Sequence, residues 1–139
     1  EEVKKILSDI GIVKDWHKEY GDKEVSLKIV DNVEEAYKHI NKYSSHHTDS
    51  IISENKENIE KFMTFVDSAN VYSNVSTRFS DGFRYGFGAE VGISTNKTHA
   101  RGPVGLEGLT IYKYKLFGNY QIVDDYVSHK SSFKHKRIK

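Results

Sequence analysis

Cysteine is absent from the 139 residues, and proline, methionine and tryptophan each occur only once. Without a thiol, the chain contains no disulfide, no thiolate metal site and no cysteine nucleophile. The single proline leaves long regular elements possible. Apolar runs extend over only a few residues, so no segment is expected to span a membrane.

An excess of charge of one sign is also missing, because 21 lysine and arginine residues face 20 aspartate and glutamate residues. The formal net charge of +1 disfavours both a uniformly basic nucleic-acid binder and an acidic disordered chain. The first residues, EEVKK, contain no hydrophobic signal region. We therefore expect one soluble, globular, cytoplasmic domain with neither a nucleic-acid nor a membrane partner.

Apolar residues recur with helical spacing in three stretches, residues 3–10, 33–40 and 59–66. Asn32 and Glu35 are placed to cap the second of these helices, and Ser53 and Asn55 are alternative caps for the third. Strand-like segments occupy residues 25–29, 48–53 and 70–75. The resulting alternation of helices and strands predicts a layered α/β unit with parallel strand pairing.

Residues 74–105 contain most of the ten glycines and the only proline, which predicts a long irregular loop of the functional kind. A short helical turn is expected at residues 106–110. The segment that runs from Ile111 to Leu116 alternates cleanly and predicts a late strand, with Tyr112 and Tyr114 on one side. Such a strand, separated from the main sheet, is suited to pairing with another subunit.

The stretch GFGAE, with Gly86 and Gly88, is superficially similar to a phosphate-binding turn. A dinucleotide fingerprint needs a third glycine at position 91 and a helix after it. Here the third glycine is Gly92, and the residues that follow do not predict a helix. A tight backbone turn is the better interpretation.

His39, His46 and His47 lie close in sequence to Asp49. Adjacent residues on a strand point to opposite faces, so His46 and His47 are not expected to share one metal ion. We therefore expect capping and packing roles for these histidines, and no metal site.

Arg78 and Arg101 both lie in the glycine-rich segment, and arginine is suited to bidentate binding of a carboxylate or a phosphate. Asn74, Ser76 and Thr77 shortly precede Arg78 and offer hydrogen bonds to the same anion. The alternative interpretation is two surface arginines in turns. The residue pattern leaves both possibilities open.

Two segments carry a resemblance to a known family. Residues 30–51 read VDNVEEAYKHINKYSSHHTDSI, and residues 66–114 read VDSANVYSNVSTRFSDGFRYGFGAEVGISTNKTHARGPVGLEGLTIYKY. The first resembles the signature of γ-glutamyl phosphate reductase, also called glutamate-5-semialdehyde dehydrogenase, and the second resembles its C-terminal core. The reductase half of bifunctional Δ1-pyrroline-5-carboxylate synthase shares these motifs. Tyr37 departs from the signature, which has an aliphatic residue there, while Ser73 and Val75 depart from the usual residues of the second segment. The positions that fit the signature are Val30, Ala36, His39, Ile40, Tyr43, Ser44, Ser45, His47, Thr48, Asp49 and Ile51.

The resemblance implies an α/β, aldehyde-dehydrogenase-like fold and a place in L-proline biosynthesis. The family reduces L-glutamyl 5-phosphate with NADPH through a catalytic cysteine that attacks the acyl phosphate. Because this chain has no cysteine, it resembles only the C-terminal portion and is expected to be inactive alone. The expected divisions are residues 1–18, a helix and shortened connection; residues 19–110, part of the catalytic domain; and residues 111–139, a late strand and basic tail.

The same resemblance implies roles for individual residues. Asn74, Ser76, Thr77 and Arg78 match the family's NASTRF motif and are expected to contact the small-molecule substrate. Glu19 resembles the superfamily glutamate that reaches the nicotinamide ribose. His47 is expected to be structural. Residues 111–116 are expected to join a homo-oligomer interface.

Two hypotheses follow for the function of the whole chain. In the first, the chain is part of an NADPH-dependent reductase. In the second, it is a non-catalytic remnant that binds a partner, such as an intact reductase subunit. The retained NVSTRF, GFGAE and HARGP stretches favour the first hypothesis, since a binding remnant needs no substrate loop.

Overall fold

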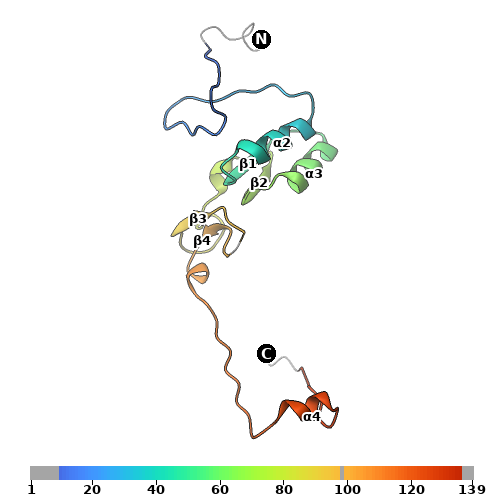
Figure 1. The fold of residues 1–139 in the computed structure, drawn as a ribbon. Helices are drawn as coiled ribbons and strands as arrows, with labels where there is room; N and C mark the ends of the chain where they lie inside the picture. Colours follow the sequence, from blue (N-terminus) through green and yellow to red (C-terminus); the bar gives the residue numbers. More distant parts are fainter. Residues whose placement is uncertain (1–9, 98, 136–139) are drawn as a thin grey trace.

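The structure is a computed structural model that describes residues 10–97 and 99–135. Its central part is a small α/β layer, followed along the chain by a short hairpin and then by an extended segment that leads away to a terminal helix (Figure 1). The helix predicted over residues 3–10 lies almost entirely outside the described residues. No helix among the described residues is both long enough and apolar enough to cross a membrane.

Two of the predicted helices are confirmed, α2 at Val33–Tyr43 and α3 at Lys56–Phe65. Asn32 caps α2, because its side-chain oxygen accepts from the Glu35 N–H at 2.9 Å. Asn55 caps α3 in the same way by accepting from the Asn58 N–H at 3.1 Å. The structure thus selects Asn55 from the two alternative caps.

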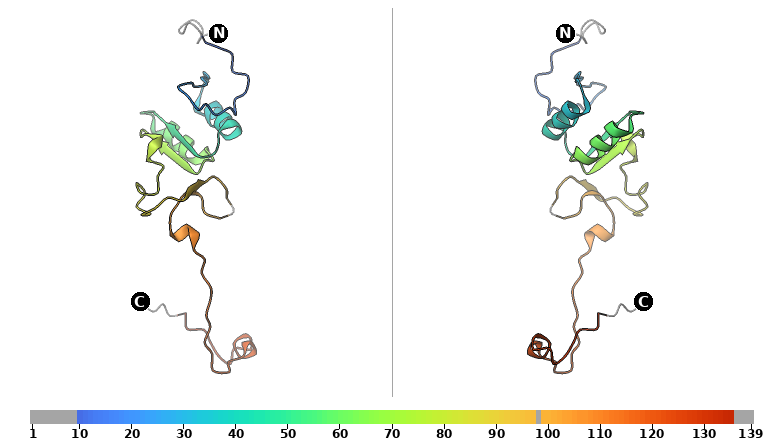
Figure 2. Two further views of the ribbon diagram at one scale, coloured as in Figure 1. Left: turned by 90° about the vertical axis from the view of Figure 1, so that its left-hand side faces the viewer. Right: turned by 90° about the vertical axis from the view of Figure 1, so that its right-hand side faces the viewer.

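The first two strands form the predicted parallel pair, β1 at Thr48–Ile51 and β2 at Asn70–Ser73. Thr48 lies opposite Asn70 and Ile51 lies opposite Ser73. The connection between them contains α3, which lies alongside β2 and against α2 (Figures 1 and 2). This β1–α3–β2 crossover is the unit that parallel pairing requires. The predicted layered α/β arrangement is therefore confirmed.

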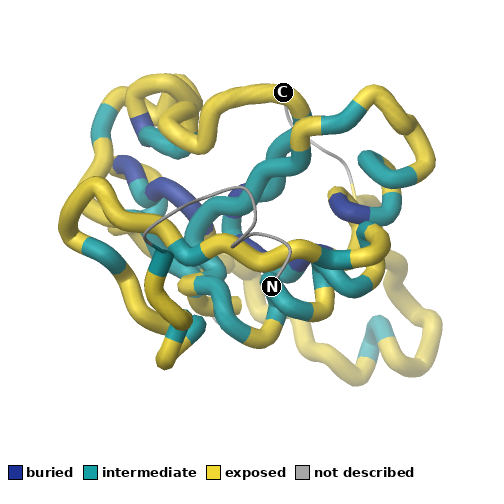
Figure 3. The backbone as a smooth tube through the Cα atoms, turned by 90° about the horizontal axis from the view of Figure 1, so that it is seen from above, coloured by how far each residue is buried: buried dark blue, intermediate teal, exposed yellow. Residues whose placement is uncertain are grey.

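The apolar core of this unit is very small. Among the described residues, Phe62 and Val66 are the only buried large hydrophobic side chains, at 3% and 6% exposure. Tyr37 on α2 stacks on Phe65 of α3 with ring centroids 5.2 Å apart, which joins the two helices at the edge of this core. Figure 3 shows that most of the backbone belongs to exposed or half-buried residues. Many large apolar side chains of residues 10–97 and 99–135 are therefore exposed.

Residues 74–105 were expected to form an irregular loop, and this prediction was wrong for two short strands. Strands β3, at Gly92–Ser94, and β4, at Gly102–Val104, pair in antiparallel fashion. Three-residue strands are too short to show a clear period of two in the sequence. The single-turn helix η1 precedes them at Thr77–Phe79, and η2 follows at Glu107–Leu109, where a helical turn was expected.

The strand predicted at residues 25–29 is also wrong. These residues form a coil that pairs with no strand among the described residues. Lys28 instead forms an ion pair with Glu35 of α2, with 3.0 Å between Nζ and Oε1, and Ser26 shares a hydrogen bond with Tyr20. Alternation alone does not produce a strand when no neighbouring strand satisfies the backbone groups.

The late strand predicted at residues 111–116 has no ladder partner within the described part of the chain. Ile111 is 87% exposed and Leu116 is 97% exposed. The segment leads to α4 at Val123–Val127, a short helix that the sequence pattern did not predict. Its alternating residues are thus presented to solvent along the extended segment of Figure 1.

Glycine is required at position 82 and not at position 92. A Cβ at Gly82 would lie 2.3 Å from the Ala89 carbonyl oxygen, whereas a Cβ at Gly92 would meet no atom within 4 Å. We expect Gly82→Ala to lower the free energy of unfolding by about 1–3 kcal/mol, as other overpacked sites do. Gly92→Ala is the matched control and should leave it nearly unchanged. Thermal unfolding of both variants, each made in the native polypeptide that carries these residues, tests this prediction. Equal melting temperatures would contradict the close approach at Gly82.

Candidate functional site

Different groups of polar residues lie at the two ends of the β1–β2 pair. In a parallel sheet the carboxyl ends of the strands meet at one edge, which is where ligands usually bind. Residues 74–79, here called the 74–79 loop, leave β2 at this carboxyl edge. The amino ends of the same strands meet at the opposite edge, where Asp67 and Asn70 lie.

At the carboxyl edge, Asn74 is bonded to β1 and to the residues after it. Its backbone N–H donates to the Ile51 carbonyl at 2.8 Å. Its side-chain oxygen accepts from the Ser53 N–H at 2.9 Å, and its side-chain nitrogen donates to the Ser53 carbonyl at 2.8 Å. The backbone of Asn74 has φ = 55°, a left-handed conformation that asparagine tolerates better than most residues. Asn74 therefore turns the chain sharply out of the sheet.

After that turn, the loop presents hydroxyl groups and one arginine to solvent. The Ser76 hydroxyl oxygen accepts from the Arg78 N–H at 3.3 Å, which closes the first turn of η1. The Phe79 N–H also donates to the Ser76 carbonyl at 3.2 Å. Ser76, Thr77 and Arg78 are all exposed, and none of the ion pairs formed within residues 10–97 and 99–135 involves Arg78. This loop can therefore offer a guanidinium group and hydroxyl groups to an anion.

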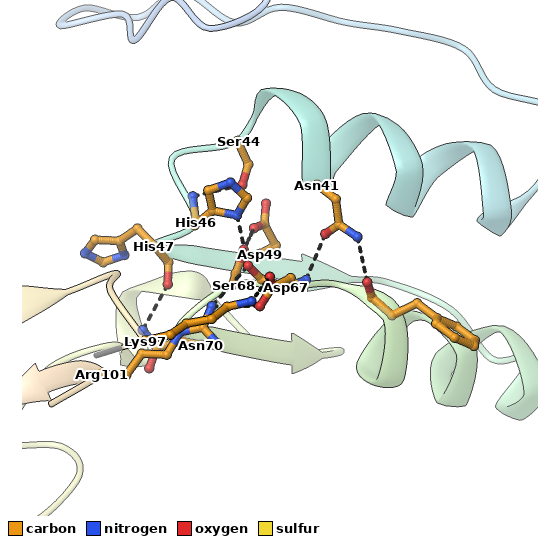
Figure 4. Close-up of polar contacts among 11 residues, drawn as sticks. Asn41, Ser44, His46, His47, Asp49, Asp67, Ser68, Asn70, Lys97 and Arg101 are labelled. Atoms are coloured by element: carbon orange, nitrogen blue, oxygen red, sulfur yellow. Dashed lines mark hydrogen bonds and ion pairs between the residues drawn. The ribbon is translucent and has the colours of Figure 1, made fainter. Parts of the chain in front are cut away.

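At the amino edge, Asp67 is the centre of a polar network (Figure 4). Its carboxylate pairs with Lys97, and it accepts from Arg101 Nη2 at 3.0 Å. Its backbone carbonyl accepts from His46 Nδ1 at 2.9 Å, and its N–H donates to the Asn41 side-chain oxygen at 2.8 Å. The hydrogen bond from Lys97 and then that from Arg101 lower the pKa of Asp67. The network ties α2, the start of β1 and the β3–β4 hairpin to the turn before β2.

Asn70 is the second polar centre at this edge and is only 6% exposed. Its side-chain nitrogen donates to the His47 carbonyl at 3.0 Å and to the Thr48 hydroxyl at 3.3 Å. Its side-chain oxygen accepts from the Tyr85 hydroxyl at 2.6 Å, and Tyr85 also shares a hydrogen bond with Tyr72. Burial, followed by this bond with Tyr72, raises the pKa of Tyr85. Asn70 thereby fastens the segment that contains Tyr85 to both strands.

The structure brings together four of the residues predicted from the sequence and separates the others. Asn74, Ser76, Thr77 and Arg78 share the loop at the carboxyl edge. Arg101 bonds to Asp67 at the amino edge, whereas Arg78 lies at the carboxyl edge of the same strand pair, so the two arginines do not form one anion site. Glu19 lies exposed in the coil before α2, and no described hydrogen bond joins it to the loop.

The other expectations from the sequence concern turns and histidines. Gly86 and Gly88 have φ values of 81° and 71°, which confirms the tight backbone turn in the GFGAE stretch. His47 Nδ1 shares a hydrogen bond of 2.7 Å with the Thr48 hydroxyl. No group of three candidate metal ligands comes together within the described ranges.

Sequence reasoning missed Asp67 and Asn70. Asp67 lies 30 residues before Lys97 and 34 residues before Arg101, so no local spacing connects them. The available signal was indirect and applies to Asn70 only, because it begins a predicted strand, where a buried polar group needs partners.

The chain is similar in sequence and in structure to known proteins that carry the name gamma-glutamyl phosphate reductase. The chain is 88% identical over 140 residues to the gamma-glutamyl phosphate reductase of Brachyspira hyodysenteriae, a match that covers 99% of the chain and 32% of that protein. It is 63% identical to the enzyme of the same name from Acetivibrio thermocellus over 90% of the chain and 29% of that protein. No protein-family model matches the chain.

The crystal structure of gamma-glutamyl phosphate reductase from Thermotoga maritima superposes with a TM-score of 0.80 at 49% identity, covering 87% of this chain and 30% of that one. The chain therefore spans about a third of the relatives it matches. The predicted resemblance to γ-glutamyl phosphate reductase and the predicted aldehyde-dehydrogenase-like α/β fold are both confirmed.

We expect the Asp67 network to make the free energy of unfolding depend on pH, and this can be measured in a chimeric protein. In it, the 139 residues replace the matching third of the Brachyspira hyodysenteriae reductase. Because the folded-state pKa of Asp67 is lowered, its contribution is present above the ordinary value near 4 and lost as pH falls through the lowered value. Asp67→Asn should therefore destabilise the chimera at pH 7, and the difference from the parent should shrink below about pH 4.

Asp22→Asn is the matched control, because the Asp22 carboxylate accepts only from the N–H of the adjacent Lys23 among the described hydrogen bonds. Denaturant midpoints at pH 7 and pH 3 provide the measurement. A difference between Asp67→Asn and the parent that stays constant with pH would show that the charge of Asp67 is not what stabilises the network.

Proposed function

We propose that this chain forms part of a cytoplasmic, NADPH-dependent reductase that converts L-glutamyl 5-phosphate to L-glutamate 5-semialdehyde and phosphate in L-proline biosynthesis. The observation that carries the proposal is the 88% identity, across 99% of the chain, to a protein named gamma-glutamyl phosphate reductase. The exposed 74–79 loop at the carboxyl edge of a parallel strand pair supports it, because that edge is the usual ligand-binding position in such sheets.

The 74–79 loop provides the groups that an acyl phosphate needs. The phosphate carries negative charge, which the planar guanidinium of Arg78 can bind through two parallel hydrogen bonds. Ser76 and Thr77 immediately precede Arg78 and are exposed, and the hydroxyl of each can donate a further hydrogen bond to the phosphate. We therefore assign substrate contact to Ser76, Thr77 and Arg78, with Asn74 at the base of the loop.

Two parts of the reaction are not provided by the described residues. The chain has no cysteine, so the nucleophile that displaces phosphate from the acyl carbon must come from residues outside it. The cofactor would supply a hydride, but Glu19, the residue expected at the nicotinamide ribose, lies exposed in a coil with no described hydrogen bond. We keep Glu19 as the proposed contact to the nicotinamide ribose, and we expect the chain alone to be inactive because it contains no cysteine.

A second candidate function is favoured by the exposed segment after η2. Ile111, Leu116 and Phe117 are nearly fully exposed, and the backbone between them is unpaired within the described part of the chain. Such a segment can add a strand to the edge of a partner's sheet. It suits a homo-oligomer contact through residues 111–116 of a reductase, and equally a non-catalytic remnant that binds an intact reductase subunit.

Activity of the chimera separates the two functions. We expect the chimera to reduce NADP when supplied with glutamate 5-semialdehyde and phosphate, the reverse direction being used because acyl phosphates hydrolyse in water. The isolated chain should give no turnover. The control is the unmodified Brachyspira hyodysenteriae enzyme assayed in parallel. A folded but inactive chimera would favour the binding remnant, and turnover by the isolated chain would contradict the requirement for an external nucleophile.

The role of Arg78 can be tested in the same chimera. Arg78→Lys should lower kcat/KM for phosphate about 10-fold to 100-fold, since a lost charge-assisted hydrogen bond costs about 1.5–3 kcal/mol. Arg84→Lys is the matched control, because Arg84 pairs with Asp81 at 2.9 Å and lysine can keep that ion pair. If Arg78→Lys behaves like Arg84→Lys, Arg78 does not contact the substrate.

A further inference from the structure

We infer that Asn74 and Ser50 are positioning residues, which hold the 74–79 loop in the orientation that presents Ser76, Thr77 and Arg78 to the substrate. This inference rests on the proposed function of the loop. It assigns Asn74 an indirect role, in which it acts through the residues that follow it, in place of the direct substrate contact expected from its motif.

The first observation is the way the Asn74 side chain replaces a strand partner. Its amide oxygen and nitrogen bond to the N–H and the carbonyl of the same residue, Ser53, at 2.9 and 2.8 Å. A side-chain amide has the same donor and acceptor as a peptide group, so it continues the β1–β2 hydrogen bonding beyond Ile51 and Ser73. These two bonds fix the orientation of the amide and with it the direction in which the chain leaves β2.

The second observation is an independent bond from β1 to the next residue of the loop. The Ser50 hydroxyl donates to the Val75 carbonyl at 3.1 Å. The backbone N–H of Asn74 is also bonded to Ile51 at 2.8 Å. Two consecutive loop residues are thus tied to β1, immediately before Ser76 begins the turn of η1. The exposed loop has no buried side chain of its own to fix its direction, so these bonds set it.

The third observation is the backbone conformation at the turn. Asn74 has φ = 55°, a conformation that is energetically unfavourable for most residues with a Cβ. Asparagine adopts it more readily than most residues, and glycine adopts it without strain. Glycine at this position therefore keeps the backbone conformation while it removes both amide hydrogen bonds. Asn74→Gly isolates the contribution of the side chain without adding a charge near the anion.

The test uses the chimera with Asn74→Gly, Ser50→Ala and a matched control, Asn55→Gly. Asn55 caps α3 through one acceptor only, and glycine is well tolerated in place of asparagine at an N-cap. We expect kcat/KM for phosphate to fall about 10-fold to 100-fold in Asn74→Gly, since small misplacements of binding groups have effects of this size. Ser50→Ala should show a smaller loss, and the KM for NADP should not change in either variant.

The Ser50→Ala variant distinguishes a positioning role from direct substrate contact, because the Ser50 hydroxyl lies on β1 and bonds to the backbone of the loop. A loss in Asn74→Gly with no loss in Ser50→Ala would overturn the positioning role in favour of direct substrate contact. Equal increases of KM for phosphate and for NADP would overturn it in favour of a general structural defect. Wild-type kinetics in both variants would also overturn it.

Hydrogen exchange provides a readout that does not depend on activity. The amide of Ser53, which donates to Asn74, and those of Phe79 and Ser80, which close η1, should exchange faster in Asn74→Gly but not in Asn55→Gly. If the parent chimera is inactive, the proposed function fails, while faster exchange still supports the positioning of the loop. Unchanged exchange in Asn74→Gly would overturn it whatever the activity.

Discussion

The parallel hydrogen bonding between β1 and β2 is the interaction on which the rest of the described structure depends. Its four paired positions set the register that places Asn74 beside Ser53 at one edge and Asn70 beside His47 at the other. A slip of one residue would reverse the direction of every side chain on the strand. The hydrogen bonds of Asn74 and those of Asn70 can form only in this register. The strand pairing therefore determines both the position of the 74–79 loop and the polar contacts at the opposite edge.

The second constraint is the shortage of buried apolar surface. Phe62 and Val66 alone form the buried hydrophobic core among the described residues, while side chains such as Ile111 and Leu116 are exposed. A core of this size cannot offset the conformational entropy of ordering the α/β unit. The hydrogen bonds and ion pairs of Asp67 and the amide bonds of Asn74 orient segments, but they contribute less to stability than a large buried apolar core would. Exposed apolar side chains of this kind are what a segment of a larger reductase, as proposed above, would leave for the rest of that enzyme to cover.

The sequence predicted α2, α3 and the parallel pair of β1 and β2, because each leaves a local pattern. The caps at Asn32 and Asn55 and the alternation of helix and strand lie within a few residues of one another. The pairing of Asp67 with Lys97 and Arg101 was not predictable, because it spans 30 residues or more and depends on the hairpin folding back. The strand expected at residues 25–29 failed for the opposite reason, since its local pattern has no partner strand in the described fold.

We propose that this chain works as a segment of a larger reductase. The intact mass of the native polypeptide, measured from its source, tests it most directly. We expect a mass several-fold above the 16.0 kDa of these residues, with a cysteine in the additional sequence. A native polypeptide of 16.0 kDa that carries no further sequence would contradict it.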